Sequence, residues 1–348
     1  MGISVLRAFL GQIHTALIKY KRNRTLIKEC TNFLHHGRYS NSVSFDCIYN
    51  THSRSQFYST TFTAQIDNLY QLSKVLIRLF NYCFTYKVHN KDNCMAFDGT
   101  EILVSSSLTE LKIFDFKNDL VLTTYKSKAK LLKVHDAKQL FAHTFNIPST
   151  LELNIDRAYL IEELIQHSNF DLEVLFSLLC DHFYRHLTYY SSQIVLNGNW
   201  YQEACSYFEA RIGKCDLINE AVGAIMVYSH GDLWSSNIIF NGERVYVTDF
   251  EHAGVRFFLY DFFMFVFTEW QLKDDDRLVA NYFQGVYDSF LTCMFRTVGL
   301  VFDSSRRNNY FMVFIVSILF ERWRGYDAID GKIVSFMNYY IRPCAEML

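Results

Sequence analysis

The spacing of apolar residues changes along this chain and predicts its secondary structure. Between residues 95 and 125, apolar and polar positions alternate, as they do in half-buried strands. Three short strands are therefore predicted, over residues 101–105, 110–116 and 119–125. After residue 170, apolar residues recur every three to four positions, which is typical of helices that pack on a core.

Other elements lie around these regions. The pattern predicts a helix over residues 127–145, which the sequence Asn146-Ile147-Pro148 ends, and a buried strand over 159–164. Residues 64–86 are a further expected helix, and residues 38–63 are expected to form loops or short strands. Helices are also predicted after residue 170 and over 261–270, 282–295, 310–323 and 333–345. This order predicts an α+β protein with a small antiparallel sheet lobe and a larger, mainly helical lobe.

One stretch within the helical region has the pattern of a β-hairpin. Residues 237–240 and 245–247 are the two predicted strands, and the turn between their apolar residues contains Asn-Gly, a strong hairpin signal. Residue numbers that face each other in this hairpin sum to about 485, so Asn237 and Asp249 are expected side by side, next to Asp232. Two carboxylates and an amide at one place form an oxygen-rich site suited to Mg2+. Phosphoryl-transfer sites are built in this way.

Composition indicates a large packed core. The 348 residues are 50% hydrophobic and 17% aromatic, and with two prolines and fourteen glycines long disordered linkers are not expected. The nine cysteines are scattered without a CxxC pair, so reduced thiols are expected rather than disulfides or structural zinc. With no signal-peptide pattern and no apolar run of about 18 residues, the chain is predicted to be cytoplasmic.

Charge is distributed unevenly. Residues 1–90 carry eleven Lys and Arg against three Asp and Glu, a balance of +8, whereas residues 91–348 have a balance of −10. Residues 1–28 combine six basic residues with apolar positions at helical spacing. This amphipathic helix either docks on an anionic membrane surface or packs on its own domain. The acidic balance of the remainder argues against a nucleic-acid partner.

The hairpin and the segment before it resemble a known family. Residues 230–237 read His-Gly-Asp-Leu-Trp-Ser-Ser-Asn, the H-x-D-x-x-x-x-N spacing of a kinase catalytic loop, and residues 249–251 are Asp-Phe-Glu where protein kinases have Asp-Phe-Gly. Gly231 and Trp234 are similar to the small-molecule branch, the aminoglycoside phosphotransferase and choline kinase group. The resemblance covers about residues 95–325 and implies a protein-kinase-like fold of two lobes.

This resemblance assigns roles to the residues of the motif. Asp232 is the expected catalytic residue, which orients or deprotonates the hydroxyl of the substrate. Asn237 and Asp249 are expected to hold Mg2+ on the phosphates of ATP. The expected supporting residues are His230, Glu251 and Asp261.

The same resemblance implies an adenine and phosphate site upstream. The backbone from Glu162 to Leu164 is the expected hinge that holds adenine. The loop over the phosphates corresponds to residues 105–109, where Ser106 and Ser107 offer hydroxyls and backbone amides. This loop departs from the family pattern because it contains no glycine.

The phosphate lysine is the second departure. Lys126 ends the third predicted strand, and Asp136 is the acid on the next helix. A separation of ten residues is short for the lysine and acid pair of kinases. Lys126 is therefore either the phosphate lysine or a solvated residue at a strand end, with Lys112 and Lys128 as less suitable substitutes.

Together these features predict three parts and one activity. The parts are a basic, mainly helical extension at 1–94, a nucleotide-binding lobe at 95–163 and a helical lobe at 164–348. The activity is ATP- and Mg2+-dependent transfer of a phosphoryl group to a hydroxyl of a small molecule or lipid-linked saccharide, with contact to a membrane through residues 1–28. The alternative is an inactive pseudokinase that binds a partner. A protein kinase is disfavoured because His-Arg-Asp and a long activation segment are missing, and the sequence leaves the oligomeric state open.

Overall fold

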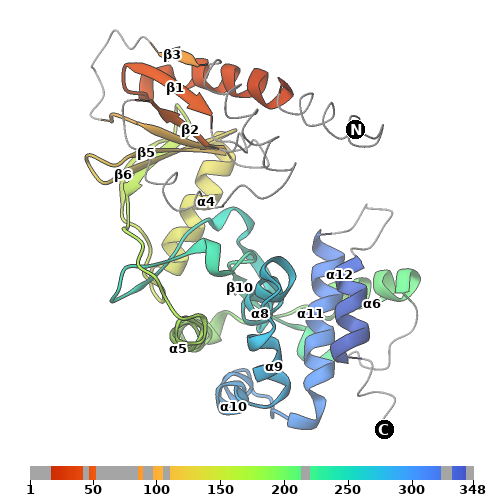
Figure 1. Ribbon diagram of the computed structural model, residues 1–348. Coiled ribbons are helices and arrows are strands. Elements are labelled where there is room, and N and C mark those ends of the chain that lie inside the picture. The colour runs from red at the N-terminus through yellow and green to blue at the C-terminus, as the bar shows by residue number, and fades with distance from the viewer. Residues whose placement is uncertain are drawn as a thin grey trace, which may run out of the picture. The chain divides into compact units, whose positions relative to one another are not determined.

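The computed structural model describes residues 17–41, 47–51, 85–88, 97–104, 110–212, 220–322 and 331–341 (Figure 1). The chain divides into two compact units. The first contains Met1–Leu132 and Pro148–Ile165, and the second contains Lys133–Ile147 and Gln166–Leu348. Sheet dominates the first unit and helices dominate the second, so the predicted α+β class is confirmed.

The first unit holds one antiparallel sheet, whose described strands have the order β3-β1-β2-β4-β5-β6-β8-β7. These strands are β1 (Gly37–Asn41), β2 (Cys47–Asn50), β3 (Tyr86–Val88), β4 (Glu101–Val104), β5 (Glu110–Asp115), β6 (Leu120–Tyr125), β7 (Thr150–Asn154) and β8 (Tyr159–Glu163). The three central strands β4, β5 and β6 coincide with those that the alternating pattern predicts. Their alternation places Ile102, Ile113 and Leu122 in one buried cluster, which explains why the local pattern is a reliable guide here.

The predicted division at residue 94 differs from this arrangement. Strands β1 and β2 pair with β4 in the same sheet, and β3 pairs with β1. Residues 17–29 are helical, and the short 3-10 helix η1 (Thr31–Phe33) follows. Tyr39 of β1 is fully buried, and its hydroxyl donates to the carbonyl of Gly99 at 2.9 Å. The described part of residues 1–94 therefore belongs to the first unit, because residues such as Ile27, Tyr39 and Ile48 pack in its core.

The second unit is mainly helical. Its helices are α5 (Leu172–Tyr189), α6 (Gly198–Ile212), α7 (Glu220–Gly223), α8 (Tyr260–Lys273), α9 (Arg277–Phe283), α10 (Asp288–Thr297), α11 (Arg307–Arg322) and α12 (Gly331–Phe336), with the short helices η2 (Ser191–Gln193), η5 (Ser304–Arg306) and η6 (Met337–Ile341). The division between the units falls within α4 (Lys128–Phe141). A small sheet joins β9 (Val195–Leu196), β10 (Ile225–Ser229) and β13 (Gly254–Phe257), while β11 (Ile238–Phe240) and β12 (Val245–Val247) form a separate hairpin.

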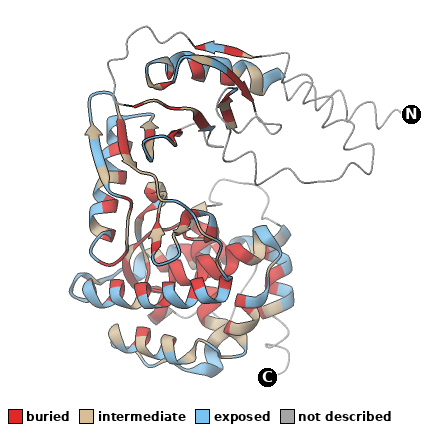
Figure 2. Ribbon diagram, turned by 60° about the vertical axis from the view of Figure 1, so that its left-hand side comes forward, coloured by how far each residue is buried: buried red, intermediate tan, exposed pale blue. Residues whose placement is uncertain are grey.

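Two helices that are buried on every side form the core of the second unit. Each residue from Tyr310 to Phe320 of α11 is buried, and so is each residue from Tyr260 to Glu269 of α8. Figure 2 shows these buried positions gathered among the helices. Aromatic rings join the two helices, with Phe263 and Phe311 4.7 Å apart between centroids. A helix that is mostly apolar around its circumference lies inside a protein, so these two helices form the buried base of the loops beside them.

Some predictions fall outside the described residues. These are most of the helix at 64–86, the first 16 residues of the basic amphipathic segment, and the loop at 105–109 that contains Ser106 and Ser107. Within the described ranges, no helix has the length and hydropathy that crossing a membrane requires.

Candidate active site

The predicted catalytic loop connects β10 to the hairpin. After Ser229, the chain passes through His230, Gly231 and Asp232 and enters the 3-10 helix η3 (Ser235–Asn237). Gly231 has φ +82°, a left-handed conformation that glycine adopts without cost. A Cβ atom at this position would lie 2.4 Å from Nη1 of Arg256 and 2.5 Å from the carbonyl oxygen of His252. Both the turn and the crowding therefore require glycine.

The loop brings Asp232 and Asn237 together. The Asn237 side-chain nitrogen donates to the carbonyl oxygen of Asp232 at 2.7 Å and to its Oδ2 at 3.1 Å. Asn237 is buried, whereas 23% of the Asp232 side chain is exposed. Because the amide nitrogen of Asn237 is turned to Asp232, the amide oxygen faces away and is the atom suited to a cation.

In the hairpin, Thr248 lies opposite Asn237, and Asp249 is the next residue along the chain. Ile238 pairs with Val247, so the register sum is 485, and the backbone N–H and hydroxyl of Thr248 donate to the Asn237 carbonyl at 3.0 and 3.2 Å. Asp249 then adopts φ 68° and ψ 63° and begins the 3-10 helix η4 (Phe250–His252). Left-handed backbone at a residue with a side chain costs about 1–2 kcal/mol. Asp119, Ala158 and Asp274 also adopt this conformation, as residues in tight turns do.

His230 holds the loop from within. Its Nε2 donates to the carbonyl of Thr248 at 2.9 Å, and its Nδ1 accepts the backbone N–H of Asp232 at 3.3 Å. Complete burial lowers the pKa of His230, and the carboxylates of Asp261, Asp249 and Asp232 oppose this shift. The imidazole is therefore neutral and carries its proton on Nε2.

Acidic residues of α8 bind the backbone of the catalytic loop. Asp261 in the first turn accepts the N–H groups of His230 and Gly231 at 2.7 and 2.8 Å. Two turns later, Glu269 accepts the N–H of Ser235 at 2.8 Å. Positions eight residues apart lie on the same face of a helix. Sequence reasoning identified Asp261 and missed Glu269.

Two arginines also reach the loop, and sequence reasoning missed both. Arg322, the last residue of α11, donates to Oδ1 of Asp232 at 2.5 Å and to the Gly231 carbonyl at 2.6 Å. Arg256 of β13 pairs with Glu321 at 2.6 Å. No local motif marks these residues, because the contact between Arg322 and Asp232 spans 90 positions.

Two further predicted residues lie around the loop. Glu251 is half-buried, its Oε1 lies 3.4 Å from Nε2 of His252, and its carbonyl accepts the Lys133 ammonium at 3.5 Å. Asp136 is exposed on α4. Both belong to the second unit, as do Asp232, Asn237 and Asp249.

The predicted adenine and phosphate residues belong to the first unit. Lys126 follows β6 and is exposed, and its neighbour Lys128 pairs with the exposed Asp156 at 2.8 Å. Glu162 lies opposite Val121 of β6, and the N–H of Leu164 donates to the Asp119 carbonyl at 2.8 Å. That hydrogen bond removes the Leu164 N–H from the groups that a hinge offers to adenine.

The donors available for a divalent cation are oxygens. Within the ranges that the structure describes, no three His, Cys, Asp or Glu side chains gather as a metal site. Mg2+ does not need such a cage, because it is usually held by one or two protein oxygens together with phosphates and water. The Asn237 amide oxygen and the Asp249 carboxylate fit this mode of binding.

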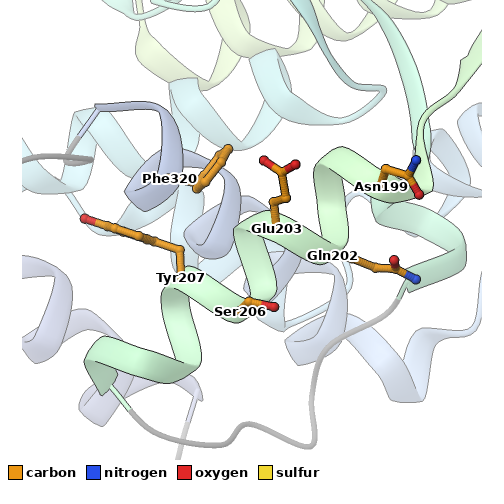
Figure 3. Close-up of a pocket in the computed structure, with 6 residues that line it drawn as sticks. All are labelled: Asn199, Gln202, Glu203, Ser206, Tyr207 and Phe320. Atoms are coloured by element: carbon orange, nitrogen blue, oxygen red, sulfur yellow. The ribbon is translucent and has the colours of Figure 1, made fainter.

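A cleft of about 710 Å3 lies along α6 (Figure 3). Its lining is polar apart from two aromatic rings, and consists of Asn199, Gln202, Glu203, Ser206, Tyr207 and Phe320. Phe320 belongs to the last turn of α11 and packs on Tyr207 with 5.8 Å between centroids. The same turn carries Arg322, so one element lines the cleft and contacts Asp232.

Residues 180–290 match the phosphotransferase enzyme family. This segment includes the catalytic loop, the hairpin and Asp261, and the match confirms the resemblance that these residues indicated. A search of curated proteins gave no match.

Three similar solved structures are named as phosphotransferases or kinases. A putative aminoglycoside phosphotransferase from Ralstonia eutropha is 14% identical, with a TM-score of 0.44. The match covers 73% of this chain and 92% of the chain of that protein. The aminoglycoside phosphotransferase APH(3'')-Id from Streptomyces rimosus is 15% identical, with coverages of 62% and 92% and a TM-score of 0.40. The choline kinase LicA from Streptococcus pneumoniae is 13% identical, with coverages of 70% and 92% and a TM-score of 0.40. With TM-scores this low, the family match is the informative finding.

Proposed function

Because residues 180–290 match the phosphotransferase enzyme family, we propose that this protein transfers the γ-phosphoryl group of ATP to a hydroxyl group of a small molecule or saccharide. The observation that carries the proposal is the contact between Asp232 and Asn237 at the start of the hairpin that leads to Asp249. This contact supports a site in which the Asp232 carboxylate faces the acceptor hydroxyl, while the side-chain oxygens of Asn237 and Asp249 face a cation. Phosphoryl transfer requires this arrangement.

Asp232 is the residue that we assign to the acceptor. Its partly exposed carboxylate accepts the hydrogen bond of the acceptor hydroxyl and aims the oxygen at phosphorus. Asn237 and Asp249 would hold Mg2+, which when bound neutralises charge on the phosphates. Neutral His230 keeps the loop in place and takes no part in proton transfer, because both of its nitrogens are used by the backbone.

The nucleotide-binding residues of the first unit remain part of the proposal. They are Ser106, Ser107, Lys126, Glu162 and Leu164, together with Asp136 as the partner acid. For Leu164 the proposal is limited to its carbonyl, since its N–H is already bonded.

The cleft along α6 supports a polyhydroxylated acceptor. Amide and carboxylate side chains such as Gln202 and Glu203 bind hydroxyl groups, and aromatic rings such as Tyr207 pack on the apolar face of a sugar. Saccharides and amino alcohols are therefore the acceptors to test first. A membrane-presented acceptor, reached through residues 1–28, stays a prediction.

The deciding experiment compares the wild-type protein with Asp232→Asn. Phosphate transfer from MgATP is measured with water, sugars and amino alcohols as acceptors, and MgATP binding is measured by calorimetry. The wild type is expected to transfer phosphate, and Asp232→Asn should lower kcat by about 100-fold or more while binding is kept. Asp303→Asn, at a turn outside the site, is the control with wild-type activity.

Two other outcomes have clear meanings. Binding of MgATP without transfer by the wild type to any acceptor would favour the pseudokinase alternative. Absence of Mg2+-dependent nucleotide binding would exclude the enzyme.

A further inference from the structure

Arg322 lies at the proposed reactive group without belonging to the motif. Its Nη2 atom is 2.5 Å from Oδ1 of Asp232. The second oxygen, Oδ2, accepts from Asn237 at 3.1 Å. Each oxygen of this carboxylate therefore has a donor from a different element, and two donors at opposite oxygens fix the plane of the group.

The arginine is presented by a rigid element. In α11 the eleven residues before Glu321 are all buried, so the backbone at the last turn has little freedom. Position at a helix C-terminus also favours a cation, because the free carbonyl groups there carry partial negative charge. About one third of the Arg322 side chain is exposed, which places it at the rim of the site rather than in the core.

A second ion pair fixes the same turn. Glu321 accepts from Nε of Arg256 at 2.6 Å, and both side chains are largely buried. The Arg256 guanidinium in turn lies over the ring of Tyr260, 4.9 Å from its centroid. Movement of the backbone that carries Arg322 would therefore require this second pair to shift as well.

We propose that Arg322 is a positioning residue for phosphoryl transfer, which sets the rotation of the Asp232 carboxylate so that its remaining lone pairs face the acceptor hydroxyl. This role rests on the function proposed above. Arg322 stays protonated throughout and exchanges no proton with the substrate. The same Nη2 atom also donates to the Gly231 carbonyl, so Arg322 fixes the carboxylate relative to the loop that carries it.

The test separates positioning from structural support. Arg322→Gln, Arg322→Lys and the wild type are compared for phosphate release from MgATP, for MgATP affinity and for melting temperature. Arg306→Gln is the matched control, since Arg306 is an exposed arginine in the turn just before α11 that pairs with Asp303. Arg322→Gln is expected to lower kcat by about 100-fold with wild-type MgATP affinity, because a misplacement of about 1 Å costs that much. Arg322→Lys keeps the positive charge but replaces the guanidinium with a single ammonium group, and it should recover part of the rate. This variant remains informative if the Gln variant does not fold.

Three results would overturn the role. They are wild-type kcat in Arg322→Gln, equal rates in the Gln and Lys variants, and a rate that falls only with the melting temperature. A wild type that neither releases phosphate nor transfers it to any of the acceptors would instead contradict the proposed function, and the role of Arg322 with it.

Discussion

Gly231 and Asp249 lie on either side of the proposed catalytic centre, and both have left-handed backbone. Gly231 has φ +82° and Asp249 has φ 68°. Glycine adopts this conformation freely, and Asp is among the residues that tolerate it best because its short side chain bonds locally. At the scale of the residue, the site thus depends on backbone conformation as much as on the carboxylates it displays.

Gly231→Ala tests this dependence. The substitution adds the cost of left-handed backbone, about 1–2 kcal/mol, and that of overpacking against Arg256 and His252, about 1–3 kcal/mol. The free energy of unfolding, measured with urea, should fall by about 2–5 kcal/mol. Gly242→Ala is the control: φ is +95°, and the new Cβ would meet only Ser168 Oγ at 3.7 Å. Equal losses in the two variants would mean that crowding at residue 231 has no cost.

At the scale of the element, single helices organise groups that lie far apart in the sequence. Helix α8 binds the catalytic loop at Asp261 and Glu269, and α11 binds it at Arg322. Helix α5 contributes indirectly, because His186 donates to the Tyr228 carbonyl in β10, two residues before His230. The stability of these helices therefore affects the geometry of the loop.

The start of α5 provides a test at this scale. Asp171 is its N-cap, and Oδ1 accepts the N–H groups of Glu173 and Val174 at 2.9 and 3.1 Å. Asp171→Ala should lower the free energy of unfolding by about 1 kcal/mol, since those N–H groups lose their acceptor. Asp276→Ala is the matched control, because Asp276 precedes α9 without a side-chain hydrogen bond to it. A loss in the control as large as that in Asp171→Ala would contradict the capping role.

At the scale of the whole molecule, three buried histidines link stability to pH. Burial lowers the pKa of His182, His186 and His230, and hydrogen bonds to backbone carbonyls oppose the shift. In the unfolded chain these imidazoles bind protons near the ordinary pKa of about 6.5. Below that pH the unfolded state therefore binds more protons than the folded state, and stability falls as pH falls.

Urea unfolding at pH 7.5 and pH 5.5 measures this linkage. The wild type should be less stable at the lower pH, and His186→Gln should reduce the slope by up to about 1.4 kcal/mol per pH unit. Gln keeps an N–H for the Tyr228 carbonyl, so the loss of the titrating group is the main change. His143→Gln, at an exposed imidazole, is the control for the effect of a His to Gln substitution as such. An unchanged slope in His186→Gln would show that His186 does not contribute.

Contacts that are close along the chain were predictable from the sequence. The alternation of apolar and polar positions predicted strands β4, β5 and β6. The Asn-Gly turn predicted the hairpin, in which the numbers of paired residues sum to 485. Asp232 and Asn237 come together because only five residues separate them within one tight loop. The details at the ends differ: Asn237 lies in η3, and it pairs with Thr248 instead of Asp249.

Contacts across long separations were decided by tertiary structure. Strands β1 to β3 join the sheet of β4 to β6, and Glu269 and Arg322 bond to the catalytic loop. Residues 38–63 were expected to form loops or short strands, but no local pattern indicated which strands they would pair with. Such contacts depend on how apolar faces pack, and packing α8 against α11 sets which polar residues at their ends arrive together. The sequence by itself thus determined the reactive motif and its hairpin, whereas the fold decided which side chains hold that motif in position.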